Sequence, residues 1–394
     1  MAVRRREIIG GAGAVLLGAL GYRAWDRGAF QSGSGEAYAP WDDWLQGEGI
    51  VRPIHSAVLA ANPHDTQPWK FIAAANTIEV MADRSRNLGS FDPFRREMHL
   101  GIGCAVENLY IAGQAFGYSC NVFPVNGRLE LSPGDQTVPA VQFGIDGGTA
   151  VHDRLFDMIP KRHTNRGPYH ADRAISPQLL EEFHRAVDSP DVRLVLIGDS
   201  IARGEFAALE VAATQATIAD RQMSADSAHW VRTGKDEIRI HRDGITMDAS
   251  GLSPMMVDVV KMLPDQDAHT ADKYWLDMTR DTHAGTAALF GMILVRDRLD
   301  MATAIAAGRA WQRLHLTATY HGVAAQPMNQ PVEMVDRNAM LGRADSFAHA
   351  LQHFAHMAGW EPTFTFRMGY AVRDALPSPR RALRDVLENL PRGA

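Results

Sequence analysis

The sequence is poor in cysteine, in net charge and in long apolar runs. Two of its 394 residues are cysteines, too few for a disulfide framework. Cys104 and Cys120 lie in one apolar stretch, where buried free thiols are favoured over a bridge. A net charge of −6 gives no general attraction to nucleic acid. A hydrophobic content of 46% with 20 prolines and 34 glycines indicates a packed globular protein, and excludes a disordered chain, a collagen and a multi-span membrane protein.

Several signatures of common enzyme classes are also missing. The sequence contains no P-loop, no G-x-S-x-G elbow and no paired-carboxylate hydrolase signature. The stretch 101–103 imitates a dinucleotide-binding turn but lacks a third glycine and a preceding strand, so it is interpreted as the start of a helix. His349, His353 and His356 share one helical face without a carboxylate at ligand spacing, which favours an amphipathic helix over a metal site. We therefore expect no resident metal.

The N-terminus has the pattern of an export signal. Arg4, Arg5 and Arg6 precede an apolar run at 8–20, a pattern similar to the twin-arginine signals that export folded proteins. A basic amphipathic helix that docks on the domain is the alternative. A small-x-small site at 37–39 is followed directly by a proline, so cleavage and an uncleaved membrane tether both stay open. We expect an exported protein of the periplasm or cell envelope, with residues 1–35 as signal and linker and the twin-arginine machinery as a partner.

The rest of the chain alternates helices and strands. A long apolar-periodic helix is predicted at 99–117, and a helix is predicted to end within 56–61. Ser176 followed by Pro177 is a good start signal for another helix. Residues 221–285 are rich in Met, Asp, His and Trp with little periodicity, which suits a lid-like excursion. This mixture favours an α+β or α/β layer fold. The predicted strands are 71–72, 77–81, 192–197 and 289–295.

Two small-residue helices repeat at a constant offset. The spacing Gly-x-Ala-x3-Leu-x7-Gly occurs at 103–117 and again at 308–322, an offset of 205 throughout. Coincidence between alanine-rich helices is the alternative explanation. An offset near half the chain favours a duplication, and so a dimer fused into one polypeptide.

Three short motifs carry chemical information. The loop at 62–69, Asn-Pro-His-Asp-Thr-Gln-Pro-Trp, can present several donors and acceptors to a planar heteroaromatic group, although a surface turn explains part of it. The stretch 162–166, Arg-His-Thr-Asn-Arg, points alternate side chains the same way and suits an anion such as phosphate, with a solvated basic loop as the alternative. At 376–381, prolines hold a basic pair in Leu-Pro-Ser-Pro-Arg-Arg.

In combination and in this order, the motifs resemble the nitroreductase-like FMN-binding oxidoreductases, specifically their double-length, exported Acg-type branch. The first loop resembles that family's P-S-x-x-N-x-Q-P-W loop, and the second motif its R-x-S-x-(R/K) phosphate signature. The stretches 92–97, 326–332 and 368–370 are also similar to segments of this branch, so the resemblance covers about residues 50–385. It implies an α+β fold built as a fused pseudo-dimer, with halves at 41–150 and 151–390 and the excursion at 221–285 in the second.

The resemblance also implies a single FMN site. Arg162, Thr164 and Arg166 would contact the FMN phosphate, ribityl chain and pyrimidine edge. The loop at 325–329 would lie along the isoalloxazine and offer a backbone N–H towards N5. Asp65 stands where the family usually has Asn, which would lower the flavin potential unless the carboxylate pairs with His64 or an arginine. The other implied cofactor-binding residues are Asn62, His64, Asp65 and Gln67 from the first half, and Pro327, Met328, Asn329, Arg380 and Arg381 from the second.

The function implied by this resemblance is a flavin oxidoreductase. A reduced nicotinamide, NADH or NADPH, would give a hydride to FMN, which would then reduce a nitro compound, a quinone or a similar small aromatic acceptor. No side chain need act as acid or base, and His64 is the one candidate proton donor. The alternative is a non-catalytic FMN-binding storage or sensing protein with the flavin under the 221–285 lid. The hypothesis of a histidine-rich metal protein is the least favoured of the three.

Overall fold

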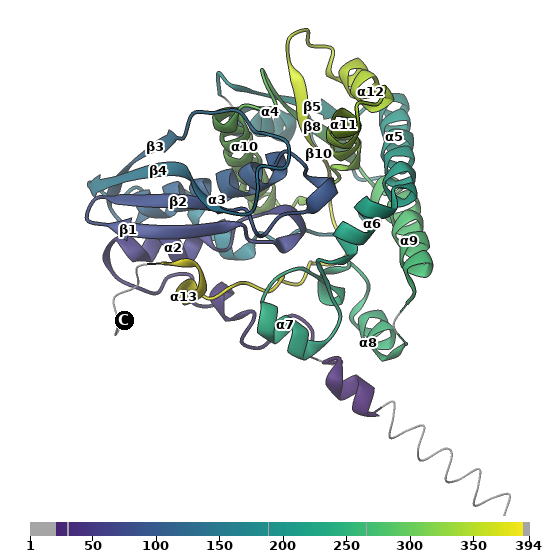
Figure 1. The fold of residues 1–394 in the computed structure, drawn as a ribbon, viewed down its shortest axis with the longest axis horizontal. Helices are drawn as coiled ribbons and strands as arrows, with labels where there is room; N and C mark the ends of the chain where they lie inside the picture. The colour runs from purple at the N-terminus through teal and green to yellow at the C-terminus, as the bar shows by residue number, and fades with distance from the viewer. Residues whose placement is uncertain (1–20, 30, 188, 265, 389–394) are drawn as a thin grey trace, which may run out of the picture.

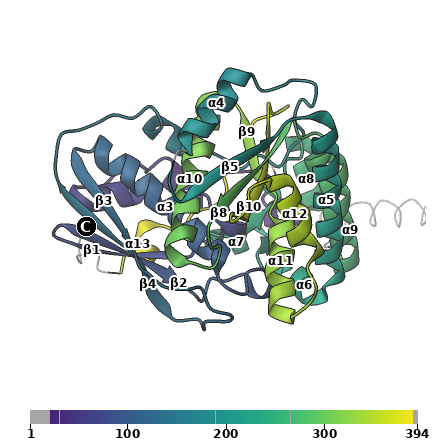
Figure 2. The same ribbon diagram turned by 90° about the horizontal axis from the view of Figure 1, so that it is seen from above.

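The computed structural model describes residues 21–29, 31–187, 189–264 and 266–388 (Figure 1). The arginines and apolar run of the predicted export signal lie outside these residues. Within the described residues, no helix combines the length and apolar character needed to cross a membrane. The described chain forms two antiparallel four-stranded sheets with two long helices between them, so the α+β expectation is confirmed (Figures 1 and 2).

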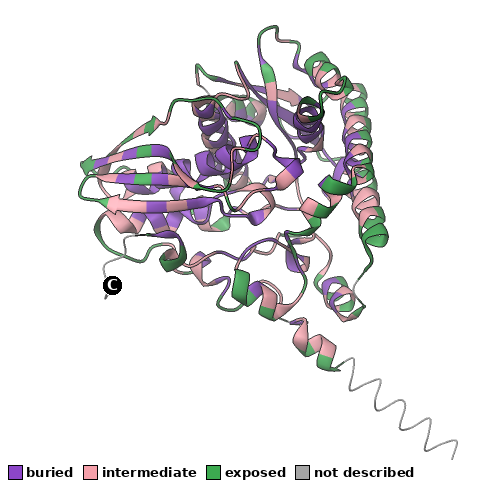
Figure 3. Ribbon diagram, in the orientation of Figure 1, coloured by how far each residue is buried: buried purple, intermediate pink, exposed green. Residues whose placement is uncertain are grey.

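The first sheet has the strand order β1-β2-β4-β3. Its strands β1 and β2 form a hairpin in which Ala74 pairs with Thr77, and helix α3 follows β2 in the chain. One face of this sheet packs on α3, while residues of the other face are exposed (Figure 3). The bounds are β1 Trp69–Ala74, β2 Thr77–Asp83, α3 Arg96–Ala115, β3 Tyr118–Pro124 and β4 Thr137–Gly147.

The second sheet repeats this topology. Its order is β5-β8-β10-β9, so in each sheet the strands run first, second, fourth, third, with a long helix between the second and third in sequence. Helices cover both faces of this sheet, which is why every residue of the inner strand β8 is buried. The bounds are β5 Val192–Ile197, β8 Leu289–Val295, α10 Met301–Tyr320, β9 Ala324–Pro327 and β10 Glu361–Gly369.

Helices α3 and α10 pack against each other at the centre of the molecule (Figure 2). Both have 20 residues, and their bounds differ by 205 at each end. They cross at Gly103 and Gly308: a Cβ built on Gly308 would lie 2.0 Å from the Leu100 carbonyl oxygen, and one on Gly103 would lie 2.3 Å from that of Ile305. The absence of side chains at both positions lets the two backbones touch. The positions related by the sequence offset therefore meet in space.

The segment between β5 and β8 and the shorter one between β9 and β10 build most of the remaining structure. Helices α5, α11 and α12 cover the outer face of the second sheet and form a second hydrophobic cluster with it (Figure 2). The segment from α6 to α8 lies below and beside the two sheets (Figure 1). The helices are α5 Ser200–Ala219, α6 Arg221–Ala228, α7 Lys235–His241, α8 Pro254–Met262, α9 Ala268–Asp277, the π-helix η7 Met278–Ala284, α11 Gln330–Leu341 and α12 Ser346–Ala355, with the parallel pair β6 Val231–Arg232 and β7 Ile245–Thr246.

The predicted elements agree with the structure where the sequence pattern is periodic. The strands expected at 192–197 and 289–295 are β5 and β8, and the helix expected after Ser176 is α4 (Pro177–Ala186), with Ser176 capping the Leu179 N–H. The helix predicted to end within 56–61 is α2 (Arg52–Ala57). The 20-residue helix α5 was not predicted. Both cysteines are free thiols, as expected, but Cys104 is buried whereas Cys120 is only half-buried.

Candidate functional site

A pocket lies where four distant segments of the chain meet. They are the loop after α2, the 162–166 motif, the stretch from Gly244 to the 3₁₀ helix η6 (Met247–Ala249), and the C-terminal segment 376–380. The first, second and last of these are the three motifs singled out in the sequence. The lining residues are Ala61, Asn62, Asp65, Arg162, His163, Thr164, Arg166, Gly244, Ile245, Thr246, Ala249, Leu376, Ser378 and Arg380.

The pocket carries an excess of buried positive charge. Three guanidinium groups, those of Arg162, Arg166 and Arg380, line it against a single carboxylate, that of Asp65. Arg162 donates from Nη2 to the Leu59 carbonyl oxygen at 2.8 Å, and Arg380 donates from Nη2 to that of Ala60 at 3.3 Å. The Nε–H groups of Arg162 and Arg380 are buried and have no partner. Two donors and two net positive charges are thus left for an anion.

The electrostatics of the pocket follow from burial. Burial lowers the pKa of Arg162 to about 9, and the neighbouring Arg380 guanidinium acts in the same direction. The pKa values of Arg166 and Arg380 are lowered for the same primary reason. Burial and then Arg162 lower the pKa of His163 to about 3, so this imidazole is neutral. An anion in the pocket would relieve the repulsion among the guanidinium groups.

The loop that carries Asp65 has a strained backbone. His64, Asp65 and Gln67 have φ values of 48°, 55° and 49°, in the left-handed region that L-residues rarely adopt. Asn62 holds the loop by accepting a hydrogen bond from the Gln67 N–H at 2.7 Å and donating to Asp65 Oδ1 at 3.2 Å. Pro63 begins the single 3₁₀ turn η3 (Pro63–Asp65). The surroundings therefore fix a conformation that the sequence alone would not favour.

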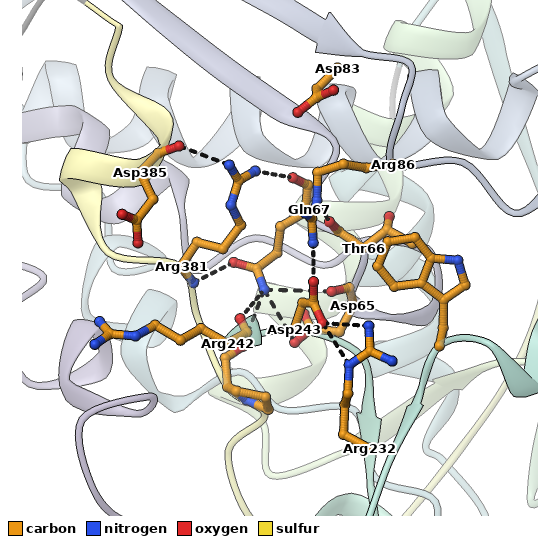
Figure 4. Close-up of polar contacts among 12 residues, drawn as sticks. Asp65, Thr66, Gln67, Asp83, Arg86, Arg232, Arg242, Asp243, Arg381 and Asp385 are labelled. Atoms are coloured by element: carbon orange, nitrogen blue, oxygen red, sulfur yellow. Dashed lines mark hydrogen bonds and ion pairs between the residues drawn. The ribbon is translucent and has the colours of Figure 1, made fainter. Parts of the chain in front are cut away.

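Gln67 and Arg381, both predicted to bind the cofactor, form hydrogen bonds with each other (Figure 4). Gln67 is fully buried; its Nε2 donates to the Arg242 carbonyl oxygen at 2.8 Å, and its Oε1 accepts from the Arg381 N–H at 2.7 Å. Arg381 Nη1 donates to the Gln67 carbonyl oxygen at 3.2 Å, and Nη2 to that of Asp385 at 2.8 Å. Neither residue lines the pocket. They fasten the C-terminal segment to the loop and so hold Arg380 in place.

His64 also points away from the pocket. Its Nε2 lies 3.0 Å from Ser227 Oγ, and its ring packs edge-on against Phe91 at 5.4 Å between centroids. Burial, helped by Arg166, lowers the pKa of His64 to about 4. The imidazole is therefore neutral near pH 7 and is not among the pocket-lining side chains, so its geometry gives no support to the proton-donor interpretation.

Residues 229–251, here termed the covering segment, close one side of the pocket. The Gly244 N–H donates to the Asp65 carbonyl oxygen at 3.1 Å, and Arg166 Nη1 donates to that of Ala249 at 3.3 Å. Asp243 receives hydrogen bonds from Arg86 of the first half and from Arg232 of the segment itself (Figure 4). The lid-like excursion predicted at 221–285 includes this segment. None of its pocket-lining residues was predicted, because the segment has little periodicity.

Pro327, Met328 and Asn329 do not line the pocket. Pro327 ends β9, which pairs with β10, and the Met328 N–H donates to the Thr365 carbonyl oxygen at 2.9 Å. Asn329 Oδ1 accepts from the Thr365 N–H at 3.1 Å, and its Nδ2 donates to Glu97. The Asn165 N–H donates to the Ala325 carbonyl oxygen at 3.2 Å, which joins β9 to the 162–166 motif. The predicted N5 loop is thus adjacent to the arginine motif but separate from the pocket.

Three buried glutamates lie near this loop. Glu97, Glu210 and Glu333 come from α3, α5 and α11, and all three are buried. Burial raises the pKa of Glu97 to about 7 and raises the pKa values of Glu210 and Glu333 well above the ordinary value of a glutamate. No group of three or more His, Cys, Asp or Glu side chains in the described part of the chain is arranged to hold a metal ion. Burial therefore favours the neutral acid form of Glu210 and Glu333.

Comparison with known proteins agrees with the resemblance that the motifs suggested. No protein-family model matches the chain. Over 351 residues the chain is 26% identical to Rv3131 of Mycobacterium tuberculosis, named as an NAD(P)H nitroreductase, and the match covers 86% of this chain and 91% of that protein. The chain is similar to NAD(P)H nitroreductases. Acg of the same organism, also named as an NAD(P)H nitroreductase, is 29% identical over 192 residues, so the match spans 48% of this chain and 56% of Acg.

Two solved structures illustrate the remote likeness. The FMN-dependent nitroreductase NfnB from Mycobacterium smegmatis, solved with NADPH, is 16% identical, with a TM-score of 0.35 and coverage of 59% of this chain and 96% of NfnB. A nitroreductase with bound FMN from Desulfitobacterium hafniense is 12% identical, with a TM-score of 0.36 and coverage of 61% of this chain and all of that one.

Proposed function

We propose that the protein is an FMN-binding oxidoreductase that accepts a hydride from NADH or NADPH and reduces a nitro compound, a quinone or a similar aromatic acceptor. The observation that carries this proposal is the pocket, where three guanidinium groups face one carboxylate and two buried Nε–H donors have no partner. Such a donor set suits a phosphate group, which takes paired hydrogen bonds from arginine. The similarity to NAD(P)H nitroreductases supports the reaction class.

The residues of the pocket fit FMN at its phosphate end. Arg162, Arg166 and Arg380 would hold the phosphate, while the Thr164 hydroxyl and the Asn62 amide offer further polar contacts nearby. When bound, FMN supplies hydride transfer between a nicotinamide and an acceptor. The protein's part is to bind the phosphate, to hold Arg380 through Gln67 and Arg381, and to exclude water with the covering segment. No side chain is assigned as a catalytic acid or base.

We also propose that the chain is a fused pseudo-dimer, with halves near 41–150 and 151–390. Three observations support a duplication: the common strand order, the two 20-residue helices offset by 205, and the contact of Gly103 with Gly308. The pocket takes the Asp65 loop from the first half and its arginines from the second, so one FMN per chain is expected. The arginine-rich start at residues 4–6 supports export by the twin-arginine route.

The absorption spectrum of gently purified protein tests the cofactor. Flavin bands in the visible are expected, and a colourless protein that fails to take up added FMN contradicts the proposal. Anaerobic addition of NADH or NADPH then tests the reaction, since bleaching of the visible band is expected of a reductase. An FMN-storing or FMN-sensing protein is the second candidate, favoured by the contacts of the covering segment with Asp65 and Arg166. A flavin that neither nicotinamide bleaches would support it.

A further inference from the structure

Asp65 occupies the arginine cluster with an anion that belongs to the protein itself. It is the single carboxylate among the pocket-lining residues and is only 8% exposed. Its Oδ1 accepts hydrogen bonds from Arg380 Nη1 and, at 3.2 Å, from Asn62 Nδ2. The carboxylate therefore holds the position on Arg380 that a phosphate oxygen would take.

Hydrogen bonds from the surroundings hold Asp65 in this position. Its carbonyl oxygen accepts from the Gly244 N–H at 3.1 Å, and the Asn62 side chain ties the loop at both ends. Arg380 is equally fixed: its Nη1 also donates to Ser378 Oγ at 3.0 Å, and its guanidinium stacks over the Trp41 ring at 4.8 Å. An anion that binds Arg380 therefore comes close to the Asp65 carboxylate, and the two negative charges repel each other.

We propose that Asp65 competes with the phosphate of the incoming ligand for Arg380, so that phosphate binding is coupled to the uptake of one proton by Asp65. This inference rests on the proposed function, because it takes FMN as the ligand. It assigns Asp65 a specific role: the residue stabilises the arginine cluster before the ligand binds and sets the pH range over which the ligand is held.

The charges around Asp65 agree with this exchange. Burial raises the pKa of Asp65 to about 6, even though Arg380 and Asn62 act in the opposite direction. Replacing part of the Arg380 interaction by a phosphate dianion would raise the pKa further, since the ionised carboxylate would lose a cation and gain a like charge. Affinity for phosphate should consequently fall as the pH rises above 6. The charged or titratable groups that face Asp65 are Arg162, Arg166, Arg380, Asp243 and Tyr38.

The experiment compares FMN binding to wild type and Asp65→Asn between pH 5 and pH 8, measured by quenching of FMN fluorescence. The phosphate of FMN titrates in both proteins, so its effect cancels in the ratio of the two Kd values. With a pKa of about 6, a carboxylate that must be protonated weakens binding by up to about 100-fold at pH 8 and hardly at all at pH 5. Asp65→Asn should therefore bind FMN more tightly at pH 8, by a factor that shrinks towards one at pH 5.

Asp385→Asn is the matched control, because it removes a carboxylate near Arg381 rather than Arg380. It should follow wild type at every pH. The melting temperature of the protein without FMN is a second readout. Asp65→Asn should melt at a lower temperature than wild type, because Arg380 loses its ion-pair partner. Calorimetry of wild type at pH 7, in buffers of different ionisation enthalpy, should show that FMN binding takes up protons. This measurement does not require the variant.

The outcomes separate this inference from the proposed function. Equal FMN affinity of wild type and Asp65→Asn at pH 8, without proton uptake, overturns the competition and leaves FMN binding intact. If neither protein binds FMN, the proposed function fails, and inorganic phosphate becomes the probe. Stronger protection of Asp65→Asn than of wild type by phosphate against thermal unfolding at pH 8 would then support the competition, and equal protection would overturn it.

Discussion

The close approach of α3 and α10 predicts that alanine at Gly308 destabilises the protein. The new Cβ would lie 2.0 Å from the Leu100 carbonyl oxygen, about 1 Å closer than packed atoms allow. Because the obstacle is backbone, no change of rotamer relieves it and the two helices must move apart. Overpacking of this kind costs typically 1–3 kcal/mol, and we expect the upper part of that range here. The gain from replacing glycine within a helix is only about 1 kcal/mol, so the net loss is about 2 kcal/mol.

Gly204 provides a matched control for this substitution. It lies within α5, and a Cβ built there meets nothing within 4 Å. Gly204→Ala should therefore raise the free energy of unfolding by roughly 0.5–1 kcal/mol, while Gly308→Ala lowers it. Urea unfolding of the three proteins measures both effects. Gly103→Ala should behave like Gly308→Ala, and the double variant should lose less than the sum, since both act at one crossing. An increase in stability for Gly308→Ala would refute the description of the crossing.

Three further predictions concern the pocket and the buried acids. Arg162→Ala should lose FMN on gel filtration whereas Arg381→Ala, outside the pocket, should retain more of it; equal retention would contradict the placement of the arginines. Flavin absorbance against protein concentration should give one FMN per chain, and a ratio of two would exclude a single shared site. Glu210→Gln should be more stable than wild type at pH 8 and similar at pH 4. Burial raises the folded-state pKa of Glu210, so its stability contribution is lost as the pH rises, by up to about 1.4 kcal/mol per pH unit. Urea unfolding of wild type and Glu210→Gln at both pH values measures this difference. The same pH dependence in the two proteins would contradict the interpretation of Glu210 as a buried neutral acid.

The sequence predicted best those features that local patterns determine. β5 and β8 are apolar runs with bounds that match the expectation, and the Ser176–Pro177 signal marks the start of α4. Of the twelve residues predicted to bind the cofactor, six line the pocket: Asn62, Asp65, Arg162, Thr164, Arg166 and Arg380. These six share a pocket, and they belong to compact motifs with a donor pattern that suits an anion.

The features that the sequence did not predict depend on contacts between distant segments. Gln67 belongs to the same motif as Asp65, yet a left-handed backbone turns its amide to Arg381. The part of the covering segment that lines the pocket is held by the pairing of β7 with β6 and by hydrogen bonds to Asp65 and Arg166, and it has no periodic pattern. Arg367, fully buried in β10, donates to the carbonyl oxygens of Gly167 and His283 and so joins the arginine motif to η7. No local pattern distinguishes such an arginine from a surface one.

The distribution of the pocket along the chain has a consequence for synthesis. Asn62 and Arg380 are 318 residues apart, and Arg380 is seated between the Ala37 carbonyl oxygen, which accepts its N–H at 2.7 Å, and the Asp65 loop. Contacts of such separation form slowly, because closing the long loop between them costs conformational entropy. A nascent chain on the ribosome therefore has no complete pocket until Arg380 has emerged, even if its first sheet has already folded. The pocket can therefore be complete only after Arg380 has been synthesised.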